Sequence, residues 1–208
     1  MVMTDTLYPL LSINRLRMGI DGQGITTLVA GAYCPLHCRW CINRQLLREA
    51  PAALITVREL LERVRVDDLY FRATNGGVTF GGGESLLHAP FIRGFREICP
   101  SAWRINVETS LAVDRELVIE SIDAVDFYII DCKDMNPDIY NAYTGGSQIK
   151  MLENLRYLLS AVGAERVFVR VPLIPGYNTP EDQQRSAETL RAMGVTQLDL
   201  FEYVRREQ

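Results

Sequence analysis

Three cysteines within one short segment constrain this chain more than any other feature. Cys34, Cys38 and Cys41 are separated by three and then two residues, and they follow an apolar run. Thiolates select zinc, copper(I) or iron–sulfur clusters, and a segment this short can surround one small inorganic centre. A closed zinc site and an ordinary cubane cluster each take four protein ligands. Three cysteines on a cubane would therefore leave one iron able to bind another molecule.

Two other interpretations of these cysteines remain open. His37 could complete a Cys3His zinc site, although it lies between two of the other ligands and the loop would have to double back. The thiols could also be redox-active or simply buried small side chains. Cys99 and Cys132 stand alone, and we expect both to be buried residues and not ligands.

The composition fits one domain and excludes several classes of protein. The 208 residues carry a formal net charge of −4, and 48% of them are hydrophobic. We expect a single domain over residues 1–208 with a short lead-in at 1–19. The slight acidity predicts no nucleic-acid partner, and the lack of a long apolar run or a signal peptide predicts no membrane partner. Five cysteines without an even, spread-out framework indicate a reducing compartment, and we expect the cytoplasm.

Hydrophobic patterns predict strands that alternate with helices. Six strands are expected, at residues 25–33, 76–80, 104–110, 126–132, 166–172 and 197–201. Helices are expected at 39–49, 56–65, 86–98 and 149–161, and a last helix begins after Thr179. This alternation predicts a parallel α/β sheet. Six such units are too few for a closed eight-fold barrel.

Glycine and charged residues gather where these strands end. They are Gly82-Gly83-Glu84, Glu108-Thr109-Ser110, Asp131 with Lys133, and Arg170. Parallel α/β folds place their chemistry at the carboxyl ends of the strands, so these residues are candidates for a ligand site. Plainer explanations also hold at this point: a loose bend, an ion-paired strand end or structural polarity.

Together, several of these motifs resemble the radical S-adenosylmethionine (SAM) superfamily. The residues that carry the resemblance are the three cysteines, the aromatic Trp40 before the last of them, and the glycine–glutamate turn after an apolar strand. Asp21-Gly22-Gln23-Gly24-Ile25 is similar to the Asp-Gly-Pro-Gly-Ile signature of the glycyl-radical-enzyme activating enzymes. The resemblance extends over residues 20–200.

The resemblance implies a fold, a reaction and partners. It implies a partial (β/α)6 barrel that is open on one side. It also implies that Cys34, Cys38 and Cys41 hold a [4Fe-4S] cluster whose open iron binds SAM. Reductive cleavage of SAM would give a 5′-deoxyadenosyl radical that removes hydrogen from a glycine of a partner glycyl radical enzyme. Flavodoxin or ferredoxin is the expected electron donor, in an anaerobic cytoplasm.

Individual roles also follow from the resemblance. The resemblance implies that Trp40 lies beside the cluster and that Gly82, Gly83 and Glu84 bind the amino group of SAM. It places Glu108 and Ser110 near the sugar of SAM, and it implies that Lys133 and Arg170 bind the SAM carboxylate. Thr109 and Asp131 are candidate ligands of a monovalent cation, and the loop with Asp21, Gly22 and Gly24 is expected to help dock the backbone of the partner.

Some residues depart from the family pattern. The family usually has proline at Gln23, often arginine at Thr26, often serine at Gly81 and commonly aspartate at Glu108. Phe201 and its neighbours stand where relatives carry a histidine that helps to hold SAM. These departures leave a second expectation open, namely a radical SAM enzyme that acts on another peptide or on a small molecule. A non-catalytic zinc-binding module is the remaining alternative.

Overall fold

The centre of the molecule is a curved sheet of six parallel strands. The computed structural model describes residues 6–49 and 51–203. The six strands are β2 (Ile25–Gly31), β4 (Gly77–Gly82), β5 (Arg104–Thr109), β6 (Phe127–Asp131), β7 (Val167–Leu173) and β8 (Gln197–Glu202). They pair in this order, each parallel to the next. The predicted parallel α/β fold, a partial barrel open on one side, is therefore confirmed.

Two antiparallel strands extend the sheet beyond β2 and were not expected from the sequence. They are β1 (Tyr8–Met18), which pairs with β2, and β3 (Ala53–Ile55), which pairs with the start of β1. Residues 8–18 fall within the stretch 1–19, for which the sequence predicts only a short lead-in. The register of β1 shifts twice against β2, and Leu16 has a φ of 53°. These irregularities break the strict alternation by which a strand is recognised in a sequence.

Helices follow most strands, and several of their ends are as predicted. They are α1 (Arg44–Glu49), α2 (Val57–Val64), α3 (Asp68–Thr74), α4 (Ala89–Ile98), α5 (Arg115–Ser121), α6 (Pro137–Thr144), α7 (Ile149–Val162) and α8 (Pro180–Ala192). Capping boxes begin α2 at Thr56 and α8 at Thr179. The predicted helix 39–49 begins only at Arg44, because the residues before it form the cysteine loop. In the part of the chain that the structure describes, no helix combines the length and apolarity needed to cross a bilayer.

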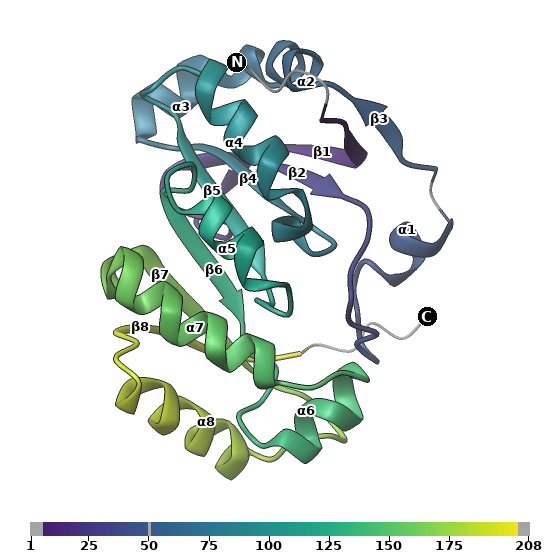
Figure 1. Cartoon of the computed structure of the whole chain (residues 1–208), viewed down its shortest axis with the longest axis vertical. Helices are drawn as coiled ribbons and strands as arrows, with labels where there is room; N and C mark the ends of the chain where they lie inside the picture. Colours follow the sequence, from purple (N-terminus) through teal and green to yellow (C-terminus); the bar gives the residue numbers. More distant parts are fainter. Residues whose placement is uncertain (1–5, 50, 204–208) are drawn as a thin grey trace.

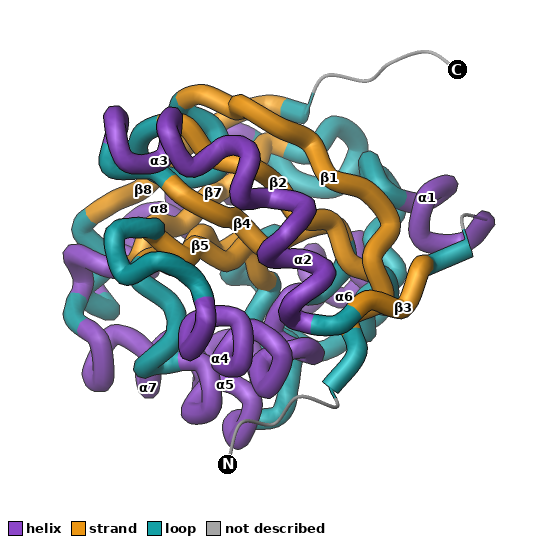
Figure 2. The backbone as a smooth tube through the Cα atoms, turned by 90° about the horizontal axis from the view of Figure 1, so that it is seen from above, coloured by secondary structure: helices purple, strands orange, loops and turns teal. Residues whose placement is uncertain are grey.

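The helices cover the outer face of the curved sheet (Figures 1 and 2). α1 and α6 are exceptions: α1 lies at the rim of the molecule in both views, and the end of α6 packs against residues 37–39. Outward-facing strand residues such as Phe80 and Val107 are fully buried, and Phe80 packs edge-on against Phe95 of α4 with 5.7 Å between ring centroids. Side chains alternate along a strand, so the intervening residues, among them Thr79 and Glu108, face the inside of the barrel. The apolar core therefore lies between sheet and helices, and the barrel interior is polar.

Inside the barrel, Gly81 makes room for Glu108 on the neighbouring strand. A Cβ atom added at Gly81 would lie 2.6 Å from Oε2 of Glu108 and 2.7 Å from a methyl group of Leu28. The other carboxylate oxygen of Glu108 accepts a hydrogen bond of 3.0 Å from Arg170. Glycine for serine at 81 and glutamate for aspartate at 108 are both departures from the family pattern. The structure places them against each other, so the longer acid occupies the space that a serine side chain would take.

We predict that Gly81→Ser lowers the free energy of unfolding by about 2 kcal/mol, because Glu108 has to move. Glu108→Asp shortens the acid, so the double variant should lose less stability than the sum of the two single variants, by about 1 kcal/mol. Denaturant unfolding of the four proteins measures both quantities. Additive losses would show that the two positions do not interact.

Candidate functional site at the carboxyl ends of the strands

One cavity of about 570 Å³ opens at the carboxyl ends of the parallel strands. Of the residues singled out in the sequence, it is lined by Asp21, Cys34, Cys38, Trp40, Cys41, Gly82, Gly83, Glu84, Glu108, Thr109, Ser110, Asp131, Lys133 and Arg170. Gly22 and Gly24 are not part of its lining. The fold thus brings together side chains that are up to 149 residues apart in the sequence.

The cysteine loop is held in shape by its own protein contacts. The backbone amides of His37 and Arg39 donate to the carbonyls of Thr144 (2.8 Å) and Tyr143 (3.0 Å) at the end of α6. The Arg44 guanidinium donates to the carbonyl of Cys38 at 2.8 Å and to that of Arg39 at 2.7 Å. All three cysteines are free thiols, half-buried, and open on the cavity. The loop is therefore shaped to present three sulfur ligands to one space.

The environment of these thiols decides between the interpretations left open above. Burial raises the pKa of Cys34 to about 12, and burial also raises the pKa of Cys38. Reactive cysteines lie in electropositive surroundings that lower the pKa, whereas burial acts in the opposite direction on these two thiols. Thiols in such a place become ligands when a metal centre removes their protons on binding. An iron centre that takes cysteine thiolates as ligands therefore fits these three side chains.

The four-ligand zinc site does not form. His37 is exposed and lies outside the cavity lining, with its backbone against α6. Among the residues that the structure describes, no group of three or more His, Cys, Asp or Glu side chains is placed to hold a metal ion. A cubane spreads its thiolates around a cage of iron and sulfide and not around a single ion, so its ligands stand farther apart.

The glycine turn after β4 lies against the start of the cysteine loop. The amides of Gly83 and Glu84 donate to the carbonyls of Gly31 (2.9 Å) and Tyr33 (2.8 Å). A Cβ atom at Gly83 would lie only 2.1 Å from the Tyr33 carbonyl oxygen, and Gly82 has a φ of +92°. Glycine is therefore required here for close backbone approach. The group that approaches is the chain's own backbone.

Glu84 is a buried carboxylate with four hydrogen-bond donors. Oε1 accepts from Thr109 Oγ1 (2.6 Å) and the Leu86 amide (3.2 Å), and Oε2 accepts from the Ser110 amide (2.8 Å) and hydroxyl (2.6 Å). Burial raises the pKa of Glu84, and these bonds oppose the rise. Thr109 and Ser110 were candidates for the cation and the sugar of SAM, and the structure places both of them on Glu84.

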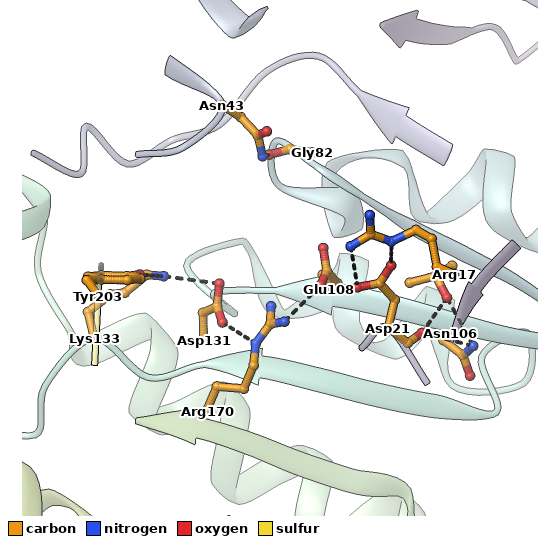
Figure 3. A network of polar contacts seen from close by, with 11 residues as sticks. Arg17, Asp21, Asn43, Gly82, Asn106, Glu108, Asp131, Lys133, Arg170 and Tyr203 are labelled. Carbon is orange, nitrogen blue, oxygen red and sulfur yellow. Dashed lines mark hydrogen bonds and ion pairs between the residues drawn. The ribbon is translucent and has the colours of Figure 1, made fainter. Parts of the chain in front are cut away.

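A row of charged side chains crosses the cavity wall (Figure 3). Arg170 lies between Glu108 (3.0 Å) and Asp131 (2.7 Å), and Lys133 reaches the same Asp131 at 3.0 Å and the Tyr203 hydroxyl at 3.2 Å. Burial by itself would raise the pKa of Asp131, but Lys133 and Arg170 hold it below its usual value. The carboxylate that was a candidate cation ligand thus already faces two cationic side chains.

Arg17 is a cavity residue that the sequence analysis missed. Its guanidinium binds the carboxylate of Asp21, which is only 2% exposed, and the second contact measures 3.2 Å. The Asp21 carbonyl accepts from the Thr79 hydroxyl at 2.6 Å. Gly22 and Gly24 both have positive φ, and added Cβ atoms would meet Asn106 at 2.5 Å and the Thr74 carbonyl at 2.4 Å. The loop of residues 21–24 is therefore folded against the sheet, and Gln23 is exposed.

These groups are suited to a ligand that carries an amino acid. A buried carboxylate and glycine carbonyls can accept from an ammonium group. Arg170 and Lys133 have five and three N–H donors, and their ion pairs in the structure use only some of them. A carboxylate could therefore bind them while the ion pairs persist. The amino-acid end of a ligand would lie next to the three sulfurs.

Comparison with known proteins agrees with this arrangement. Residues 28–190 match the model of the radical SAM superfamily. The pyruvate formate-lyase 1-activating enzyme of Escherichia coli (strain K12) is 29% identical over 189 residues, which cover 88% of this chain and 76% of that protein. The isethionate sulfite-lyase activating enzyme of Oleidesulfovibrio alaskensis is 27% identical over 247 residues, covering 89% of this chain and 80% of that protein.

Solved structures share the fold. The crystal structure of Streptococcus suis SuiB superposes with a TM-score of 0.64 over 86% of this chain and 40% of that chain, at 10% identity. The region matched by the family model contains the cysteine loop, the glycine turn and the charged strand ends. The chain belongs to the radical SAM superfamily.

Proposed function

We propose that this protein is an activating enzyme that generates a glycyl radical on a partner enzyme. The observation that carries the proposal is the cavity that three cysteines share with Glu84, Lys133 and Arg170, the groups that could bind an amino acid. Among the described residues that line it, these three are the only Cys or His side chains. The similarity to two proteins named as activating enzymes favours a protein substrate over a small molecule.

When bound, a [4Fe-4S] cluster and SAM would supply an electron and a 5′-deoxyadenosyl radical, which takes hydrogen from the partner's glycine. Cys34, Cys38 and Cys41 would hold the cluster. The turn carbonyls would receive the SAM ammonium group, and Glu84, whose oxygens already accept from four donors, would supply a negative charge beside it. Arg170 and Lys133 would receive its carboxylate with their remaining donors. The protein's task is to bind and orient these groups and to exclude water.

The partner would enter at the open side of the barrel. Three apolar side chains line the mouth and are exposed there: Ile20, Trp40 and Ile42, the last being 90% exposed. Buried Asp21 lines the same cavity and would help to receive the backbone of the partner, with Gly22 and Gly24 shaping its loop. A flavodoxin or ferredoxin would deliver the electron in an anaerobic cytoplasm, where cluster thiolates survive. A monovalent cation at Asp131 would have to share the carboxylate with Lys133 and Arg170.

The first prediction concerns the cluster. Anaerobic reconstitution with iron and sulfide should give a brown protein that forms 5′-deoxyadenosine from SAM under strong reductant. Cys38→Ala should abolish that product, because the cluster loses one of three ligands. Cys99→Ala is the matched control, since Cys99 is a buried thiol outside the cavity. Product formation by Cys38→Ala, or none by the wild type, would contradict the proposal.

The second prediction concerns the partner. Reduced, SAM-loaded protein mixed with a glycyl radical enzyme from the same organism should produce the electron paramagnetic resonance doublet of a glycyl radical. The signal should disappear when the acceptor glycine of the partner is changed to alanine. If 5′-deoxyadenosine forms without any candidate partner giving the doublet, the enzyme is a radical SAM enzyme with another substrate.

A further inference from the structure

Asn43 ties the cysteine loop to the glycine turn. It stands two residues after the last cluster cysteine, and its side-chain amide Nδ2 donates to the carbonyl of Gly82 at 2.8 Å (Figure 3). The two residues are 39 positions apart in the sequence, and both line the cavity. Neither the cysteine motif nor the glycine–glutamate motif includes this asparagine.

The bond completes the attachment of the turn to the cysteine segment. Gly83 and Glu84 are held through their amides by the carbonyls of Gly31 and Tyr33, as described above. Asn43 holds the preceding residue through its carbonyl. All three residues of the turn are thus fastened to the segment that contains the cysteines. The turn cannot change its position without moving the loop.

Asn43 also limits the hydrogen bonds that the Gly82 carbonyl can accept. A carbonyl oxygen has two lone pairs, and the asparagine amide uses one of them. The other is left for a donor in the cavity, with its direction set by the first bond. Glu84, two residues on, supplies the negative charge at the same place.

We infer that Asn43 is a positioning residue, which aims the Gly82 carbonyl at the ammonium group of SAM and holds that subsite in register with the cluster. This inference rests on the proposed function, because it presupposes that SAM binds in the cavity. It assigns Asn43 no contact with the reacting atoms. Its effect is on the amino-acid end of the ligand and not on the nucleoside.

The test uses cluster-loaded protein and three variants. Asn43→Asp keeps the size of the side chain but replaces the donor with an acceptor that repels the Gly82 carbonyl. Asn43→Gln keeps the donor on a longer stem. Gln197→Glu is the matched control, since its amide donates to the carbonyl of Glu165 at 2.9 Å and Gln197 is not part of the cavity lining. Iron content is measured for each, and the dissociation constants of SAM and 5′-methylthioadenosine are measured by anaerobic equilibrium dialysis.

We expect Asn43→Asp to raise the dissociation constant of SAM about tenfold while iron content stays that of the wild type. Binding of 5′-methylthioadenosine, which lacks the amino-acid group, should change less than about twofold. Asn43→Gln should recover most of the loss, and Gln197→Glu should bind as the wild type does.

Three results would overturn the inference: unchanged SAM binding by Asn43→Asp, an equal loss for both ligands, or iron loss in step with SAM loss, which marks a purely structural role. If the wild type itself holds iron but binds no SAM, the proposed function fails first, and the inference fails with it.

Discussion

The site depends on the join between the end of β2 and the turn after β4. Two backbone hydrogen bonds link these segments at a separation where no side chain fits, since a Cβ at Gly83 would collide with the Tyr33 carbonyl. The cysteine loop directly follows β2, and Glu84 belongs to the turn after β4. The loop that carries the three cysteines and the buried Glu84 carboxylate are therefore held in fixed positions relative to each other by the sheet itself.

The rest of the barrel interior is arranged around charge. An ordinary barrel fills its centre with layers of branched apolar side chains. Here the inner faces of β5, β6 and β7 carry Glu108, Asp131 and Arg170, and Arg170 forms an ion pair with each of the two carboxylates. Burying such groups is costly, and pairing offsets the cost. The result is a polar wall in which Arg170 and Lys133 keep N–H donors that can bind an anionic group while their ion pairs persist.

Much of this arrangement could be predicted from local sequence. The six parallel strands follow from hydrophobic patterns, and Thr56 and Thr179 mark helix starts because capping boxes are local. β1 could not be recognised, since its bulges and the left-handed Leu16 destroy the alternation. The motif residues line one cavity because the parallel strands end at one edge of the sheet.

The connections between those residues could not be predicted, because they join distant positions. Thr109 and Ser110 carry no sign that they hold Glu84, 25 and 26 residues earlier. Arg17 lay in a segment with no recognised pattern, and Asn43 gave no sign of its partner 39 residues later. The close contact between Gly81 and Glu108 could not be predicted either, because it depends on the register in which β4 pairs with β5.

The central claim is that three thiolates leave one iron of a cubane for an outside ligand. Mössbauer spectroscopy of 57Fe-reconstituted protein, with and without SAM, tests it most directly. The account predicts that one iron in four changes its isomer shift when SAM is added while the other three do not. Four equivalent irons whose isomer shifts do not change when SAM is added, or a protein that takes up no iron, would contradict it.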